Sequence, residues 1–103
     1  MKSLIDISQE IYDRLSKYCK HVYFQPPNNL KIEYPCIIYK RSRIENIHGN
    51  NNVYNQNHPF EIIVIDTDPD SKITENISRL SKCRFDRRYT SDNLYHDVFT
   101  LYY

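Results

Sequence analysis

The chain has 103 residues, of which 40% are hydrophobic and 26% charged, and 14 Lys and Arg residues nearly balance 13 Asp and Glu residues. This length predicts a single domain, and the near-zero net charge argues against a dedicated nucleic-acid-binding protein, which is usually basic. No apolar run approaches the roughly 18 residues of a membrane span, and the N-terminus lacks the apolar core of a signal peptide. We therefore expect a soluble protein that is made in the cytosol and does not contact a membrane.

The tyrosine and cysteine content of the chain indicates its functional class. The chain has 10 tyrosines and no tryptophan, and tyrosine is enriched in strands and at protein interfaces. The three cysteines, Cys19, Cys36 and Cys83, are too few and too widely spaced for a disulfide framework or a zinc site. We expect buried free thiols and favour an interaction protein over an enzyme.

The periodicity of apolar residues predicts the elements in chain order. Spacings of three and four across residues 3–20 indicate an amphipathic helix with Ser3 as its N-cap. Strands are predicted at residues 21–24, 35–41 with proline as the first residue, 60–65, 83–89 and 94–103. The strand at 60–65 is apolar on both faces apart from Glu61, so we expect it at the centre of the sheet and covered on both sides.

Asp66 to Ser71 is expected to end that strand and to begin a second helix. Asp68 is the predicted N-cap, with Pro69 at the first helical position and Asp70 in the first turn. Residues 90–93 are predicted to form a four-residue hairpin loop between the last two strands.

The resulting order, α-β-β-β-α-β-β, predicts an α+β fold with a mostly antiparallel sheet, two helices and one domain over residues 1–103. Residues 44–58 are polar, and five of the ten asparagines lie between residues 50 and 57, so we expect a long loop with its tip at 48–52. Loops of this length are usually functional, or ordered only on binding.

Several motifs that resemble catalytic sites do not fit. Asp66-Thr67-Asp68 matches the Asp-x-Asp of metal-dependent glycosyl transfer, but the chain has no room for a nucleotide-binding domain. An EF-hand loop that starts at Asp66 has Ser71 where glycine is needed and Ile77 where the bidentate acid is needed. Pro69-Asp70 is not followed by the acid-x-Lys of a nuclease, and the four histidines lack metal-ligand spacing. We predict no catalytic residue, no metal and no cofactor.

Charges are segregated along the chain. Residues 61–75 carry five acids and one base, whereas residues 79–88 carry five bases and one acid. The plainer interpretation is a solvated surface with a few ion pairs inside one chain. The sharper hypothesis is that the two flanks lie on different sides and meet head-to-tail between copies, which closes a ring. It assigns six residues to the subunit interface: Asp66, Asp68, Asp70, Arg84, Arg87 and Arg88.

Four segments carry a resemblance to a known family. They read Tyr-Pro-Cys-Ile-Ile-Tyr at 34–39, Val-Ile-Asp-Thr-Asp-Pro-Asp-Ser at 64–71, Cys-Arg-Phe-Asp-Arg-Arg-Tyr at 83–89 and Asp-Asn-Leu-Tyr-His-Asp-Val-Phe at 92–99. In this order and spacing they resemble the small tail-terminator or tail-completion proteins of tailed bacteriophages. Residues 1–33 add no support beyond an amphipathic helix.

The resemblance implies a structural virion protein without enzymatic activity. Such a protein forms a ring, usually a hexamer, at the head-proximal end of the tail, ends polymerisation of the tail tube and offers a surface to the head. The implied partners are further copies of the chain, the tail tube protein and a head-completion or connector protein, with DNA passing only through the lumen. Its implied location is the virion neck, after assembly in the host cytoplasm. We expect the loop tip to dock on the last tube ring, through His48, Gly49, Asn50, Asn51 and Asn52.

Two alternatives stay open. The nearest is a head-completion or stopper ring on the other side of the neck. The second is a nucleic-acid-binding module that uses the basic strand at 79–88 together with Lys40, Arg41 and Arg43, with Phe85 and Tyr89 stacking on bases. The residues Asp92, Asn93, His96 and Asp97 are expected to have structural roles.

Overall fold

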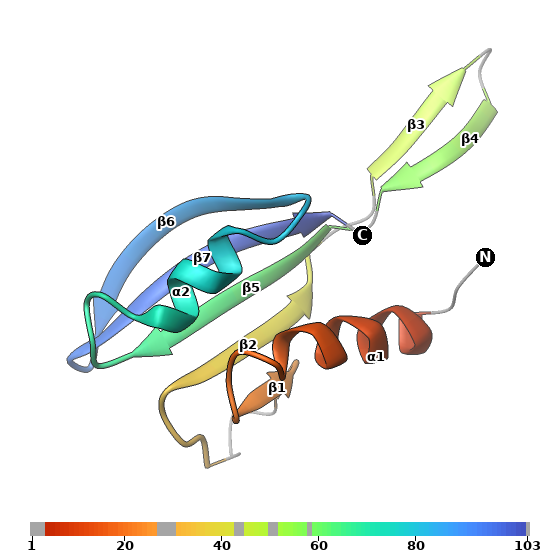
Figure 1. Ribbon diagram of the computed structural model, residues 1–103. Helices are drawn as coiled ribbons and strands as arrows, with labels where there is room; N and C mark the ends of the chain where they lie inside the picture. The colour runs from red at the N-terminus through yellow and green to blue at the C-terminus, as the bar shows by residue number, and fades with distance from the viewer. Residues whose placement is uncertain (1–3, 27–30, 43–44, 50–51, 58, 103) are drawn as a thin grey trace.

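The computed structural model describes residues 4–26, 31–42, 45–49, 52–57 and 59–102 (Figure 1). In these ranges the helices are α1 (Leu4–Leu15) and α2 (Lys72–Ser78). The strands are β1 (Val22–Phe24), β2 (Cys36–Arg41), β3 (Glu45–Gly49), β4 (Asn52–Asn57), β5 (Pro59–Asp66), β6 (Cys83–Ser91) and β7 (Leu94–Tyr102). The predicted α+β fold is confirmed.

A five-stranded sheet in the order β1-β2-β5-β7-β6 forms the body of the protein. Its β2–β5, β5–β7 and β6–β7 pairs are antiparallel, and β1 runs parallel to β2. Strand β5 lies at the centre, as its apolar sequence predicts. The two edges of the sheet differ, because β1 has 3 residues whereas β6 has 9.

Both helices cover the same face of this sheet (Figure 1). Ile11 of α1 and Ile77 of α2 are fully buried and belong to one core cluster, which includes alternate residues of the strands. On β5 these residues are Phe60, Ile62 and Val64, each 0% exposed. The strand was predicted to be covered on both sides; in the described ranges the helices cover one side, and on the other side Ile63 is half-buried whereas Ile65 is buried.

Helix α1 is shorter than predicted and ends at Leu15 instead of residue 20. Its apolar stripe of Ile7, Ile11 and Leu15 is buried against the sheet, whereas Tyr18 lies in the following turn and is exposed. The Tyr39 hydroxyl of β2 donates a hydrogen bond of 3.0 Å to the backbone carbonyl of Ser8, which fixes the helix to the sheet. The predicted N-cap, Ser3, lies outside the described residues.

Helix α2 begins three residues later than predicted, because the expected N-cap was Asp68 and the expected first helical residue was Pro69. Ser71 is the N-cap residue and Lys72 is the first helical residue. The reason is local: Asp66 Oδ1 accepts the Asp68 N–H at 3.1 Å, and Asp68 Oδ1 accepts the Asp70 N–H at 2.9 Å. These two consecutive Asx turns satisfy the backbone outside a helix, so Asp70 precedes the helix and does not lie in its first turn.

The 44–58 segment differs from the expected loop. It contains strands β3 and β4, which pair with each other as a separate two-stranded sheet with an irregularity between Ile47 and His48. The hairpin extends away from the body (Figure 1), and the chain measures 50 × 24 × 24 Å along its principal axes. Of the predicted docking tip, His48, Gly49 and Asn52 lie in these strands, whereas residues 50–51 lie outside the described residues.

The hairpin between β6 and β7 has a two-residue turn in place of the predicted four-residue loop. Asp92 and Asn93 have φ angles of 54° and 63°, the left-handed pair that a type I′ turn requires. Thr90 and Ser91 therefore belong to β6 and pair with Tyr95 and Leu94. Asn and Asp are the residues other than glycine that best tolerate this conformation.

We expect the Asn93→Val variant to lower the free energy of unfolding by about 1–2 kcal/mol, because a branched side chain is disfavoured in the left-handed region. The Asn93→Gly variant should stay within about 0.5 kcal/mol of the wild type. Thermal unfolding of both variants checks this. Equal melting temperatures for the two would contradict the left-handed turn.

Candidate self-association surface

The longest exposed feature of the body is the outer edge of β6. Its first residue is half-buried and the next eight, from Arg84 to Ser91, are exposed. Strand β6 pairs with β7 on one side and is the last strand of the sheet on the other. A long edge strand presents unpaired N–H and C=O groups that favour pairing with another chain.

A β-bulge interrupts this edge. The register shifts between Phe85 and Arg87, so Asp86 is the extra residue on β6. The Asp86 carboxylate accepts hydrogen bonds from Thr100 Oγ1 of β7 and from Arg84 Nε, the latter at 3.0 Å. Bulges and charged residues limit unspecific pairing of sheet edges. The β6 edge is therefore accessible to another chain, but its bulge and its charges disfavour unspecific aggregation through strand pairing.

Arg88 leaves the edge and points toward the helical face, where it meets a buried carboxylate. Its Nε and Nη2 atoms donate to the two oxygens of Asp97 at 2.5 and 3.1 Å, and the Thr74 hydroxyl donates to the same carboxylate at 2.7 Å. Arg88 Nη2 also donates to the Pro69 carbonyl at 2.8 Å. This cluster joins β6, β7, α2 and the turn before α2.

The electrostatics of the cluster favour the ionised pair. Burial alone raises the pKa of Asp97, whose side chain is 3% exposed, but the hydrogen bonds from Arg88 and Thr74 outweigh burial and hold its pKa below the ordinary value. The Arg88 side chain is 39% exposed and so keeps part of its hydration. Asp97 thus has a structural role, as expected from the sequence.

These contacts correct the charge hypothesis. Arg88 and Asp70 line the same surface hollow, and Arg88 binds the carbonyl next to Asp70, so these acidic and basic residues do not lie on different sides of the subunit. Asp66 and Asp68 hold the Asx turns of their own loop. Ion pairs inside the chain also occupy Arg84, which contacts Asp86, and Arg79, which contacts Glu75 at 2.8 Å. Arg87 lies 5.8 Å from the centre of the Tyr89 ring, a cation–π arrangement.

The sheet face opposite the helices is organised in rows by the strand register. The middle row is apolar across three strands, Ile38, Ile63 and Val98, with Tyr23 and Arg87 at its ends. Val98 is buried, whereas Ile38 and Ile63 are half-buried. Within the described ranges neither helix lies on this face.

Two rows flank this apolar row; one is polar, and the other is mixed and begins with the buried residues Cys36 and Ile65. One contains Lys40 and Glu61, whose charged groups are 3.7 Å apart, followed by Thr100 and Arg84. The other row ends in His96 and Tyr89, whose rings stack with their centroids 4.6 Å apart. An apolar centre with a polar and aromatic rim is typical of protein interfaces.

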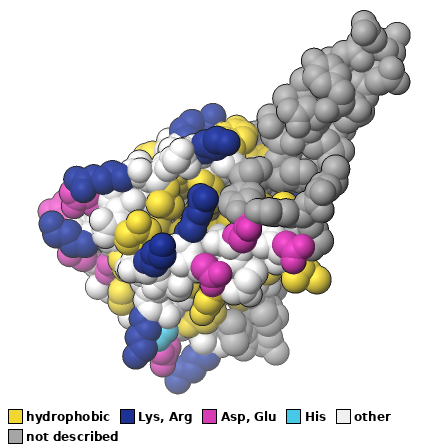
Figure 2. Space-filling model, turned by 45° about the vertical axis from the view of Figure 1, so that its right-hand side comes forward, with side chains coloured by type: hydrophobic (Ala, Val, Ile, Leu, Met, Phe, Trp, Pro, Cys, Tyr) yellow, Lys and Arg dark blue, Asp and Glu magenta, His cyan; other side chains and the backbone are white. Residues whose placement is uncertain are grey.

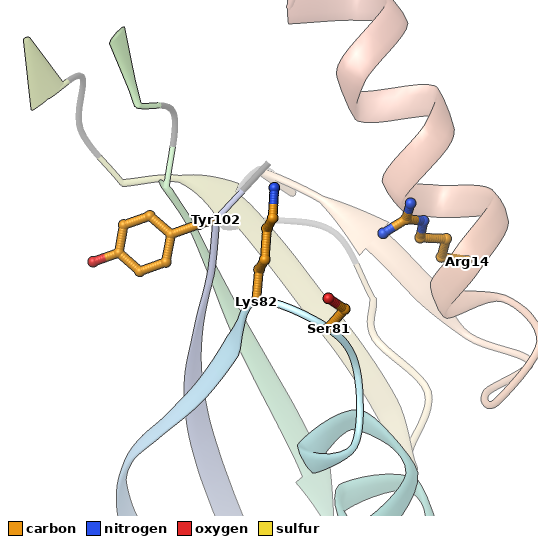
Figure 3. Close-up of a pocket in the computed structure, with 4 residues that line it drawn as sticks. All are labelled: Arg14, Ser81, Lys82 and Tyr102. Carbon is orange, nitrogen blue, oxygen red and sulfur yellow. The ribbon is translucent and has the colours of Figure 1, made fainter. Parts of the chain in front are cut away.

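A basic pocket of about 220 Å³ lies where β6 begins. Arg14 of α1 extends toward the turn that carries Ser81 and Lys82, whereas the Tyr102 ring points away from them (Figure 3). Two cationic side chains suit a single anionic group. Elsewhere, Lys and Arg side chains are spread among acidic and apolar ones on the face that Figure 2 shows, and they form no continuous basic stripe there.

The cysteines do not form a reactive site in the described chain. Burial raises the pKa of Cys36 to about 12 and that of Cys83 to about 11, and burial also raises the pKa of Cys19. These thiols stay protonated at neutral pH and are poor nucleophiles. Among the described residues, no group of three or more His, Cys, Asp or Glu side chains is placed to hold a metal ion.

No described helix combines the length and the apolar character needed to cross a membrane. No protein-family model matches the chain, and no curated protein matches it.

We expect the Asp97→Asn variant to lower the free energy of unfolding by about 2 kcal/mol, because it removes the charge that Arg88 and Thr74 bind. The effect should depend on pH. The lowered pKa of Asp97 means that its contribution is complete above pH of about 4, near the pKa of an unfolded aspartate, and is lost as the pH falls through the folded pKa.

Urea unfolding of the wild type and the variant at several pH values measures this difference. Their free energies should be separated at neutral pH and converge in acid. Asp92→Asn, at the exposed hairpin turn, is the matched control and should change stability by less than about 0.5 kcal/mol. A constant separation at every pH would contradict an ionised Asp97 as the stabilising group.

Proposed function

We propose that this protein is a structural subunit that assembles into a ring at the head-proximal end of a bacteriophage tail. The ring, a hexamer by the resemblance of residues 34–103 to tail-terminator proteins, ends polymerisation of the tail tube and provides the surface for head joining. The observation that carries the proposal is the β6 edge, nine residues long with eight of them exposed, beside a sheet face with an apolar centre on which neither described helix lies.

The proposed activity needs surfaces and no chemistry. A growing tube exposes a face that binds the next ring of subunits. A ring that fits this face on one side and differs on its other side stops the addition. The sheet offers such a difference, since its helical face and its open face carry different side chains.

The β3–β4 hairpin supports contact with a second ring. It extends beyond the body of the subunit (Figure 1), and a two-stranded sheet is marginally stable in water without a partner surface. We assign residues 48–52 to docking on the last ring of the tail tube, which would supply the partner surface that a two-stranded sheet needs.

The first alternative, a head-completion ring, would need a similar small α+β subunit and therefore stays open. The second alternative, nucleic-acid binding, is supported by fewer observations. Its one favourable observation is the pocket of Arg14 and Lys82. Two of the arginines that it needs on β6 instead bind carboxylates of their own chain, Arg84 with Asp86 and Arg88 with Asp97. DNA binding by the isolated chain with a steep salt dependence would favour this alternative.

Electron microscopy of particles from a phage that lacks this gene tests whether the protein acts at the end of the tail. We expect overlong tubes without heads, beside full unattached heads, because nothing stops addition to the tube. Free tails of normal length beside empty or leaking heads would move the protein to head completion. Unaffected virions would contradict both.

A further inference from the structure

Helix α1 has a second row of apolar side chains next to its buried stripe. Ile5 and Tyr12, seven residues and about two turns apart, are 80% and 40% exposed. With Phe24 of β1 and Tyr39 of β2 they line a groove of about 330 Å³, which Ser8 and Gln9 complete. The Phe24 and Tyr39 rings pack together at 4.9 Å between centroids and form one wall of the groove.

The opposite edge of the sheet presents an apolar projection. Phe85 of β6 is 49% exposed, although it lies on the helical side of the strand. Its ring contacts Phe99 edge-on, with centroids 5.4 Å apart and planes at 70°, and the bulge at Asp86 follows it directly. These contacts fix one side of the ring and leave the other side to solvent.

The two edges also carry opposite charge. Helix α1 has three acids, Asp6, Glu10 and Asp13, and one base, Arg14, which gives a net charge of −2. Strand β6 has three arginines and one aspartate. Arg88 is paired with Asp97 of β7, so the remaining charges of the strand, Arg84, Arg87 and Asp86, give +1. Pairing two β6 edges brings like charges together, whereas pairing β6 with the α1 edge brings opposite charges together. Complementary charge selects the partner and the register of a contact.

We infer that neighbouring copies of this chain dock edge to edge, with Phe85 of one copy in the α1 groove of the next. Strand β1 and helix α1 lie at one edge and β6 at the other (Figure 1), so each copy has both halves of the contact. Such a heterologous contact repeats from copy to copy and closes into a ring when the rotation between copies allows it. The inference rests on the proposed ring and names its subunit interface.

Two variants that each spoil one half of the contact test it. Ile5→Asp places a charge at the groove, and Phe85→Glu places one on the projection. Both positions are exposed, so we expect the fold to persist, which circular dichroism checks. Tyr18→Asp is the control, since Tyr18 is exposed after α1 but does not line the groove. Sedimentation velocity over a concentration series to about 1 mM reads the association.

We expect each variant alone to associate at least about thirtyfold more weakly than the wild type, and the control to associate like the wild type. A mixture of the two variants should form dimers and nothing larger. Its one intact contact joins Phe85 of the Ile5→Asp chain to the groove of the Phe85→Glu chain, whereas the reverse contact opposes two acids. This dimer distinguishes a heterologous contact from a symmetric one.

The outcomes separate the inference from the proposed function. If the wild type forms oligomers and both variants do so equally well, or if their mixture forms no dimer, the edge contact is wrong and the ring stands. If the wild type stays monomeric over the whole series, self-assembly fails and the edge contact fails with it.

Discussion

The structure depends on the fact that both helices lie on one face of a five-stranded sheet. A single core forms between the helices and alternate side chains of the strands, and it buries residues such as Ile11, Phe60 and Phe99 completely. The same arrangement leaves the second face of the sheet without a helix in the described ranges, and it leaves the β6 edge to the solvent. Burial on one side thus produces both the stability of the subunit and the surfaces by which we propose that it assembles.

The ion pair of Arg88 and Asp97 contributes both to the stability of the subunit and to the charge of its β6 edge. It holds α2, β6, β7 and the turn before α2 together. Because Arg88 is paired with Asp97 and Arg84 contacts Asp86, Arg87 is the arginine of the strand that has no carboxylate partner within the described part of the chain. The charge pattern assigned Arg88 to a contact between subunits, but in the structure Arg88 binds groups of its own chain and holds β6 in place.

Sequence periodicity predicted the two helices and the five strands of the main sheet, because those elements bury a regular set of apolar residues. It did not predict β3 and β4, whose polar, asparagine-rich sequence has no apolar alternation to reveal a strand. The start of α2 was predicted at the wrong residue because an aspartate in an Asx turn looks like a helix N-cap in the sequence. Asp66 and Asp68 accept backbone N–H groups in two such turns before the helix begins. The groove at Ile5 and the projection at Phe85 could not be predicted, because locating them requires the order of the strands in the sheet, which periodicity alone does not reveal.

The most direct test of the central claim is negative-stain electron microscopy of the purified wild-type chain at high concentration. A ring subunit predicts closed particles of uniform diameter with a central opening. Open filaments or monomers alone at every concentration would contradict the account.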